Sequence, residues 1–401
     1  MKPKTLMRFP QNPARFVFVA CLVATVSPVC AQSLDTAAVD ALVEAARKAW
    51  VVPGAAVAIV KDDKVVHLKG YGFKEQGKPD PVTPDTIFNI GSTGKSFTAL
   101  AAAILADEGK LSWDDPVRKH LTYFRLADPE ADRQATLRDL ATHRVGLARH
   151  DELWRDSPPL SREQIIRRVG RLSLEKPFRS TFLYNNLMYL ALGSAAGAAD
   201  GSSWEEVVQT RIFDPLGMKT ANFSHTAAQQ SPDHSSPHVK DGSRIRVIPW
   251  RNLENIAPAG SINASARDLS QWLRFQLGDG TIDGQRVLSR AALAETHKPQ
   301  MPTPLGGKTK AIFPHAKNPA YCLGWNSHTN RGHFILWHGG GGPTGFRTQI
   351  LLVPASRLGI AVISNVEGVP QLPEPVINGI LDLALGFPRT DWNKVILGAS
   401  R

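Results

Sequence analysis

The segment Ser92-Thr93-Gly94-Lys95 places a hydroxyl and an amine at a spacing suited to nucleophilic catalysis. A serine hydroxyl is a weak nucleophile until a neighbouring group takes its proton. In a helix, a lysine three residues after a serine lies on the same face, so its nitrogen can hydrogen-bond the serine oxygen. Ser92 also opens a predicted helix, where its backbone N–H can face a developing oxyanion. We therefore predict Ser92 as the nucleophile and Lys95 as its partner.

A second copy of Ser-x-x-Lys makes the motif ambiguous when it is taken alone. A chain of this length is expected to contain about one copy by chance. The other copy, Ser173-Leu174-Glu175-Lys176, is followed by Pro177 and opens no apolar helix. We interpret that copy as a solvated stretch before a turn.

The segment Tyr184-Asn185-Asn186 supplies a second pair of groups that suit the same chemistry. A tyrosine near a lysine can have its pKa lowered and can serve as a base. Asn186 can orient the lysine or hold a substrate carbonyl. The alternative is that Tyr184 packs through its ring while the asparagine lies in a turn.

A run of four glycines follows His338, at the end of a predicted strand. Glycines there let a substrate backbone lie against the strand edge and leave N–H groups exposed. One such N–H can complete an oxyanion hole with that of Ser92. His338 can anchor a substrate carboxylate or help to move a proton. The alternative is a glycine-rich turn, but four consecutive glycines exceed what a turn needs.

The elements that must position these residues form strands at both chain ends and helices between them. We expect an α/β (α+β) fold in which one antiparallel sheet is built from both ends, with flanking helices and an inserted, mostly helical lobe. The single domain spans residues 32–401, with a sheet lobe at about 35–90 and 320–390 and a helical lobe at about 92–310. Expected helices are 35–50, 92–108, 138–143, 162–171, 187–196, 204–212, 266–276 and 374–385; expected strands are 55–60, 64–68, 332–337, 346–353 and 358–364; 224–245 is expected to be a surface loop.

The N-terminus has the pattern of a secretory signal peptide. A basic stretch precedes an apolar run from Phe16 to Val26, and Val29-Cys30-Ala31 offers small residues to a signal peptidase. We predict cleavage after Ala31 and a periplasmic or secreted protein. The alternative is an uncleaved membrane anchor, although the run is short for a spanning helix. Cleavage would leave Cys322 as the remaining cysteine, which we expect to be a small buried residue.

Composition and motifs exclude several other functions. The net charge is +11, but no Lys/Arg run is interleaved with aromatics, so nucleic-acid binding is not expected. His225, His234 and His238 lie near Asp233, yet Pro237 prevents a shared helical face, so we predict no metal. We expect no cofactor either. The absence of Gly-x-Ser-x-Gly disfavours the other large serine-hydrolase architecture.

The three motifs, in the order Ser-x-x-Lys, Tyr-x-Asn and His-x-Gly, resemble those of the serine β-lactamase and penicillin-binding-protein superfamily. The tyrosine and His-Gly elements are typical of its class C-like branch, which includes D-amino-acid peptidases and lactamase-like esterases. The resemblance covers most of residues 35–392 and includes the stretches 88–91, 137–143, 257–262 and 345–346.

The resemblance implies a role for each site residue. Ser92 would be acylated, while Lys95 and Tyr184 would share the general base and acid work. Asn186 would bind substrate and position the lysine. The N–H groups of Ser92 and Gly341 would form the oxyanion hole, with Gly340 and His338 in the same substrate-binding strand end.

Two positions depart from the common pattern of relatives. Val145 stands where a serine is common, and His338 replaces a lysine, as in many esterase-like members. No Ser-Asp-Asn is present, which argues against the class A arrangement. Members of the most similar branch often carry a further C-terminal β-rich domain, which we expect this chain to lack.

The expected function is hydrolysis, through an acyl-enzyme, of a small-molecule ester or a D-amino-acid peptide or amide, with cell-wall fragments among the candidate substrates. A β-lactamase, a D-Ala-D-Ala carboxypeptidase and a non-catalytic sensor of cell-wall peptides are the alternatives. The sequence predicts no oligomeric state.

Overall fold

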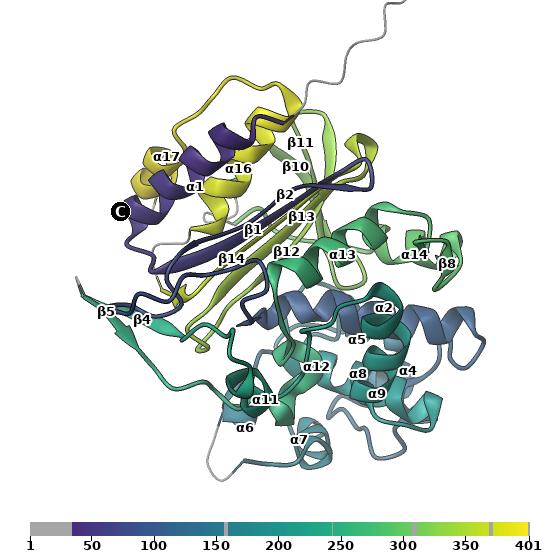
Figure 1. Ribbon diagram of the computed structural model, residues 1–401. Coiled ribbons are helices and arrows are strands. Elements are labelled where there is room, and N and C mark those ends of the chain that lie inside the picture. The colour runs from purple at the N-terminus through teal and green to yellow at the C-terminus, as the bar shows by residue number, and fades with distance from the viewer. Residues whose placement is uncertain are drawn as a thin grey trace, which may run out of the picture. The chain divides into compact units, whose positions relative to one another are not determined.

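An eight-stranded antiparallel sheet forms the centre of the computed structural model, and both ends of the chain contribute to it (Figure 1). The structure describes residues 34–155, 159–242, 244–306, 310, 312–368 and 372–399. The expected signal peptide lies outside these residues. The strand order is β2 (Lys64–Gly72), β1 (Gly54–Lys61), β14 (Leu358–Ser364), β13 (Arg347–Val353), β12 (His333–Gly340), β11 (Asn326–Asn330), β10 (Ala316–Tyr321) and β9 (Met301–Pro302).

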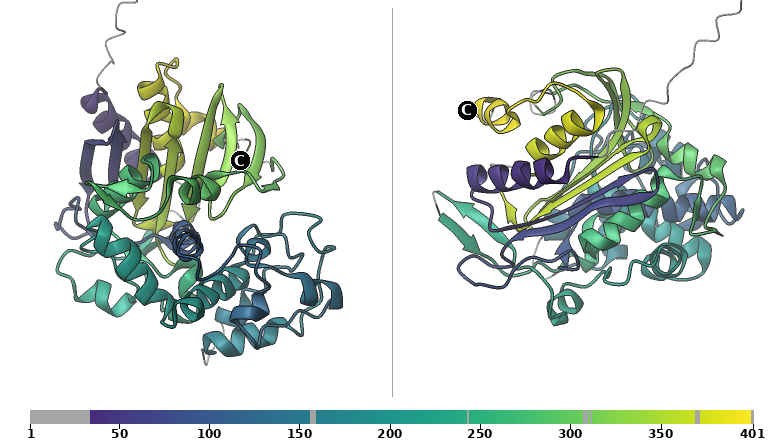
Figure 2. Two further views of the ribbon diagram at one scale, coloured as in Figure 1. Left: turned by 90° about the vertical axis from the view of Figure 1, so that its right-hand side faces the viewer. Right: turned by 45° about the horizontal axis from the view of Figure 1, so that its top comes forward.

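Both faces of the sheet are covered, which explains why β1 is apolar along nearly its whole length. Alternate side chains of a strand point to opposite faces. Ala56, Ala58 and Val60 accordingly join the core that contains the helical lobe. Val57 and Ile59 join a second core with the terminal helices. Those helices are α1 (Thr36–Trp50), α16 (Pro373–Leu385) and α17 (Trp392–Ala399), which share one side of the sheet in Figure 2.

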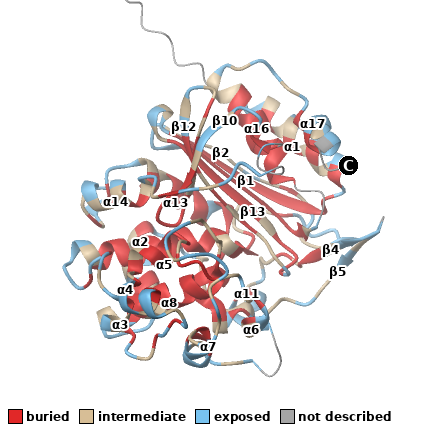
Figure 3. Ribbon diagram, turned by 180° about the vertical axis from the view of Figure 1, so that it is seen from behind, coloured by how far each residue is buried: buried red, intermediate tan, exposed pale blue. Residues whose placement is uncertain are grey.

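The opposite face packs on α13 (Ala266–Leu277) and on a helical lobe whose centre is formed by α2 (Gly94–Asp107) and α8 (Asn186–Asp200). These two helices are buried along most of their length, as Figure 3 shows. The other helices of this part are α3 (Val117–His120), α4 (Pro129–Gln134), α5 (Leu137–Ala141), α6 (Glu152–Arg155), α7 (Arg162–Val169), α9 (Trp204–Val208), α10 (Asp214–Leu216), α11 (His225–Gln230), α12 (Ala257–Gly260) and α14 (Arg290–His297).

Three small sheets complete the described fold. Strand β3 (Phe88–Asn89) pairs with β6 (Asn263–Ala264), immediately before the predicted nucleophile. The others are β4 (His238–Asp241) with β5 (Arg244–Val247) and β15 (Val366–Glu367), and β7 (Thr281–Ile282) with β8 (Gln285–Arg286).

The structure confirms the expected fold class, an antiparallel sheet from both chain ends with an inserted helical lobe. It corrects two segments. The stretch 224–245 is not simply a loop, because it contains α11 and most of the β4–β5 hairpin. Strands β10 and β11 were not expected, because Pro319 and a run of polar residues hide their β character. Among the described residues, no helix is long and apolar enough to cross a membrane.

Candidate active site

Ser92 lies in a 3₁₀ turn, η1 (Gly91–Thr93), which leads directly into α2. The turn is held by Asn89, whose Oδ1 accepts a hydrogen bond from Gly91 N at 3.1 Å. The Nδ2 of Asn89 donates to the carbonyl oxygen of Gly260 at 3.2 Å. Gly91 has a φ of +53°, a conformation that favours glycine. The side chain of Ser92 is thereby presented, partly exposed, at the start of a buried helix.

Lys95 follows one turn later and is fully buried. Its Nζ lies 3.1 Å from Ser92 Oγ. The same nitrogen donates at 2.8 Å to Asn186 Oδ1 and at 2.8 Å to the carbonyl oxygen of Ala259. Burial lowers the pKa of Lys95 well below its usual value, and the nearby charge of Arg149 acts in the same direction. The amine is therefore held in one place beside the hydroxyl and is biased towards its neutral form.

Asn186 is oriented by a carboxylate that the sequence did not single out. Its Nδ2 donates to Asp151 Oδ1 at 2.9 Å, so its Oδ1 must face Lys95. Asp151 also accepts from Trp154 Nε1 at 2.9 Å and pairs with Arg149 at 2.6 Å. A single aspartate in an irregular segment carries no sequence pattern, and only the fold brings it to this position.

Tyr184 completes the group around the nucleophile. Its hydroxyl hydrogen-bonds the side chain of Ser92, and Lys95 Nζ lies 4.8 Å from the centre of its ring. We expected the lysine to lower the pKa of Tyr184, but burial raises this pKa well above its usual value. A lysine that is itself biased towards neutrality offers little positive charge to a neighbouring phenolate. In the resting site the phenol is therefore protonated.

The glycine run lets the end of β12 approach the nucleophile turn. A Cβ atom on Gly340 would lie 1.8 Å from the carbonyl oxygen of Ile90, and one on Gly91 would lie 2.7 Å from Gly341 N. Gly341 lines the same cavity as Ser92. Gly340, which we expected to contact substrate, is instead buried against Ile90 and pairs with Thr348 of β13. Its glycine is needed for backbone packing.

We expect Gly340→Ala to destabilise the fold by about 1–3 kcal/mol, because an overpacked methyl group must push the two backbones apart. The shift also moves Gly341 away from Ser92, so turnover should fall at least about tenfold. Thermal unfolding and ester hydrolysis check both effects. Gly339→Ala is the matched control, since a Cβ there meets its nearest atom at 3.6 Å. Equal behaviour of the two variants would contradict this account.

His338 does not occupy the position expected for a carboxylate anchor. The side chain is buried, and its Nδ1 lies 2.8 Å from the carbonyl oxygen of Gly339. A carbonyl only accepts, so Nδ1 carries the hydrogen and Nε2 accepts from the Tyr321 hydroxyl at 3.1 Å. Burial lowers the pKa of His338 to about 3. A neutral ring with both nitrogens engaged cannot supply the positive charge of an anchor.

His143 supports the tyrosine from behind. Its Nδ1 accepts the backbone N–H of Asn185 at 3.1 Å, and its ring centre lies 4.5 Å from that of Tyr184. The residue is fully buried and has a φ of +56°. The backbone amide that it holds lies between Tyr184 and Asn186 in the chain, so His143 helps to fix both motif residues. The sequence indicated this residue only within the stretch 137–143.

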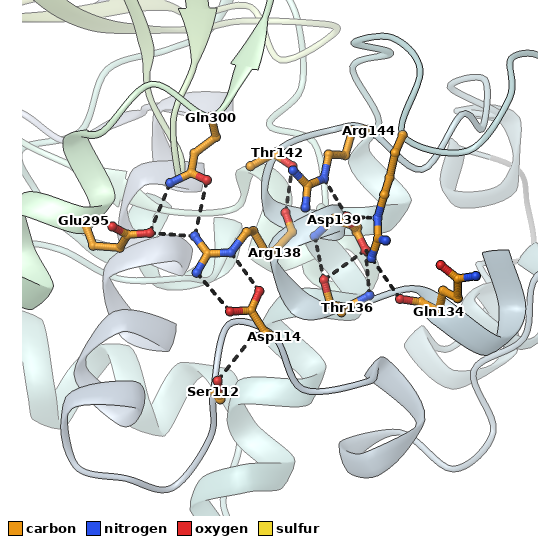
Figure 4. A network of polar contacts seen from close by, with 11 residues as sticks. Ser112, Asp114, Gln134, Thr136, Arg138, Asp139, Thr142, Arg144, Glu295 and Gln300 are labelled. Atoms are coloured by element: carbon orange, nitrogen blue, oxygen red, sulfur yellow. Dashed lines mark hydrogen bonds and ion pairs between the residues drawn. The ribbon is translucent and has the colours of Figure 1, made fainter. Parts of the chain in front are cut away.

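The helix before His143 is fixed by a buried carboxylate, as Figure 4 shows. Asp139 of α5 is fully buried, and its Oδ2 accepts from both the backbone and the hydroxyl of Thr136 at 2.9 Å. Arg144 and Arg179 form ion pairs with it at 2.5 and 2.8 Å. These contacts hold the pKa of Asp139 below its usual value despite burial. The network fixes the end of α5 from which His143 extends.

The other candidates from the sequence lie in different surroundings. Ser173–Lys176 follows α7 and forms no helix. His238 accepts from Gln76 N at 3.0 Å and contacts the Asn365 carbonyl at 2.7 Å, whereas His234 contacts the Ser231 carbonyl at 2.7 Å. Within the described part of the chain, no group of acidic, histidine or cysteine residues is arranged to hold a metal ion.

The structure thus brings Ser92, Lys95, Tyr184 and Asn186 together, with Gly341 on the same cavity wall. Their catalytic roles stay predictions. The described residues that line the cavity are Gly91, Ser92, Arg149, Trp154, Arg155, Asn186, Leu253, Ile256, Ala259, Gly260, Gly341, Gly342, Pro343 and Thr344.

Comparison with known proteins identifies related sequences over most of the chain. The family model described as beta-lactamase matches residues 39–382. Two unguisins hydrolases, from Aspergillus violaceofuscus and Aspergillus campestris, are 27% and 31% identical over 87% and 86% of this chain. Protein flp of Staphylococcus aureus is 27% identical over 84% of it. The chain spans about 65% of the length of these relatives.

Two solved structures share the fold. An octameric penicillin-binding protein homologue from Pyrococcus abyssi has a TM-score of 0.76 and 26% identity, covering 88% of this chain and 78% of its own. A class C beta lactamase from Rhodobacter sphaeroides has a TM-score of 0.68 and 23% identity, covering 87% and 99%. The second likeness concerns the fold alone.

Proposed function

Since this chain belongs to the beta-lactamase family, we propose that it is a serine hydrolase that acts through an acyl-enzyme at Ser92 on a carboxylic ester or a D-amino-acid peptide or amide. The observation that carries the proposal is the placement of Lys95 Nζ. It lies 3.1 Å from Ser92 Oγ and is fixed by two further partners. The hydrolase names of two relatives support turnover over binding alone.

The hydrogen bonds around Lys95 suit a general base. A neutral amine has two N–H bonds and one lone pair. Asn186 Oδ1 and the Ala259 carbonyl can only accept, so they take both N–H bonds. The lone pair is left to face Ser92 Oγ and to receive its proton as the oxygen attacks the substrate carbonyl.

The remaining steps use Ser92 and Gly341, which line the cavity, and Tyr184, which hydrogen-bonds Ser92. The N–H groups of Ser92 and Gly341 donate to the oxyanion of the tetrahedral intermediate. The intermediate collapses by breaking the bond to the leaving group, which takes a proton from the Tyr184 phenol. The proton that Lys95 took from Ser92 then passes to the phenolate, which restores the phenol and the neutral amine; Lys95 Nζ lies 4.8 Å from the centre of the tyrosine ring. Water then attacks the acyl-enzyme and gives a proton to the same base. The bond between the acyl carbon and Ser92 Oγ breaks, the serine oxygen takes that proton back, and the acid is released.

Export to the periplasm or medium is part of the proposal and rests on the amino-acid pattern of residues 1–31 alone.

A substrate panel tests the proposal. We expect p-nitrophenyl acetate or butyrate to be hydrolysed, and a fluorophosphonate to label Ser92 covalently. Nitrocefin and D-Ala-D-Ala peptides in the same panel separate an esterase from a β-lactamase and a carboxypeptidase. Failure of every substrate, together with absence of the covalent adduct and tight binding of a cell-wall peptide, would favour the non-catalytic sensor instead.

A further inference from the structure

The cavity beside Ser92 has a positively charged wall. Among the described residues that line it, the charged ones are Arg149 and Arg155, and none is acidic. Their side chains are 53% and 40% exposed, so both guanidinium groups can meet a ligand. A substrate entering the cavity therefore meets a positive potential.

Trp154 gives this charge a fixed platform. The indole is buried, and its Nε1 donates to Asp151 Oδ1 at 2.9 Å. The guanidinium carbon of Arg155 lies 4.9 Å from the ring centre, and that of Arg251 lies 5.5 Å from it. After the effect of burial, the charge of Arg155 further lowers the pKa of Arg251, as expected for two cations held close together. Two arginines thus meet at one aromatic ring beside the nucleophile.

Among the described residues, the acids near these arginines do not neutralise all of them: the charge of Glu367 raises the pKa of Arg251, and Asp151 pairs mainly with Arg149. Asp151 pairs with Arg149 at 2.6 Å, but with Arg155 only at 3.5 Å. Its Oδ1 is also occupied by Trp154 and Asn186. A guanidinium has five N–H donors, and one long contact leaves most of them available to a ligand. A carboxylate matches this planar, permanently charged fork, which can bind its two oxygens through two parallel N–H bonds.

We propose that the substrate carries a carboxylate, which Arg155 and Arg251 bind beside Trp154 while Ser92 attacks the scissile carbonyl. This inference rests on the proposed hydrolase function and names its substrate class, an anionic ester or peptide. Leu253 and Ile256 line the same cavity and suit an apolar spacer between the two groups. The buried, neutral His338 does not compete for the carboxylate.

Matched substrates test the proposal. Mono-p-nitrophenyl glutarate, whose carboxylate lies on the acyl part, is compared with p-nitrophenyl valerate. The valerate ester has the same chain length, with a methyl group in place of the carboxylate. Acetyl-D-Ala-D-Ala, whose carboxylate lies on the leaving group, is compared with its neutral C-terminal amide. We expect kcat/KM to be about tenfold or more higher for the anionic member of one pair, and this preference to shrink at high salt. The pair that responds shows which part of the substrate carries the carboxylate.

The variant Arg155→Gln should lower kcat/KM for that anionic substrate about five- to tenfold and leave its neutral partner unchanged. Arg155→Gln/Arg251→Gln should remove the preference. Arg286→Gln, on β8, removes the same charge from an exposed position that does not line the cavity, and should have no effect. Equal kcat/KM within both pairs, or an equal loss on charged and neutral substrates, would overturn the proposal while the hydrolase function stands.

A binding measurement separates the two proposals if no substrate turns over. Glutarate monoamide should bind the wild-type protein in calorimetry, and Arg155→Gln should weaken that binding about five- to tenfold. Binding without turnover or labelling would sink the hydrolase function and retain the carboxylate site. An unchanged affinity in the variant, or no binding at all, would overturn the carboxylate site.

Discussion

Ser92→Ala is expected to reduce kcat on p-nitrophenyl esters by about 10⁴-fold or more, because no acyl-enzyme can form without the attacking oxygen. The oxyanion donors and the substrate contacts remain, so substrate affinity should change little. The side chain is small and partly exposed, and the contacts with described residues that its removal breaks are those with Lys95 and Tyr184. The fold should therefore persist, with unfolding temperatures close to those of the wild type.

Ser173→Ala is the matched control, since Ser173 opens the other Ser-x-x-Lys of the chain. That stretch lies in turns after α7 and forms no helix that would stack its lysine on its serine. The control should retain full turnover and full fluorophosphonate labelling. Labelling of Ser92→Ala to the wild-type extent, detected by mass spectrometry of the intact protein, would place the nucleophile elsewhere.

Lys95→Met is expected to reduce kcat by about 10²–10⁴-fold, the range for loss of a positioned general base. Methionine fills a similar volume with an apolar chain, so the buried space stays occupied. It leaves Asn186 Oδ1 and the Ala259 carbonyl without their donor, which costs about 1–3 kcal/mol per unsatisfied group. Stopped-flow measurement of acylation, alongside denaturant unfolding, separates the catalytic loss from the structural one.

The same variant tests the electrostatic state of the lysine through pH. The pKa of Lys95 is lowered in the folded protein, so at a pH between the folded and unfolded values the unfolded chain binds the extra proton. The free energy of unfolding therefore rises with pH across that window and levels off above the unfolded pKa. Lys95→Met lacks this contribution, so the wild type should gain stability relative to the variant as pH rises.

The acid limb of the rate profile should follow the same group. If neutral Lys95 is the base, kcat/KM of the wild type increases as pH rises through the lowered pKa of this lysine, and the residual activity of Lys95→Met lacks that limb. Asp382→Asn is the control, and we expect it to keep the acid limb of the rate profile. Asp382 lies in α16, where it pairs with Arg331 and contacts Trp392 of α17. A parallel pH dependence in wild type and Lys95→Met, in both rate and stability, would contradict a neutral buried base.

Much of the architecture could be predicted from the sequence, because the spacing of apolar residues within one segment indicates both its secondary structure and its buried face. The apolar stripe of 35–50 became α1, the run at 55–60 became β1, and the three late strands became β12, β13 and β14. Strands at both ends with helices between them leave few ways to bury both faces of a sheet. Strands without a periodic apolar pattern were not predicted from the sequence. β10 and β11 are built largely from polar residues, and pairing with neighbouring strands decides their conformation.

By itself, the sequence determined which side chains can carry chemistry. Ser92 and Lys95 lie within one helical turn, and their partner groups in Tyr184–Asn186 could be named from residue type and order alone. Only the tertiary structure decided their electrostatic state. Lys95 meets Asn186 and Ala259 from 91 and 164 residues away, and Asp151 orients that asparagine. A pKa depends on what surrounds a group and what excludes water from it, and no local pattern records that. The same reason explains why Tyr184 stays protonated and His338 lies neutral beneath the site.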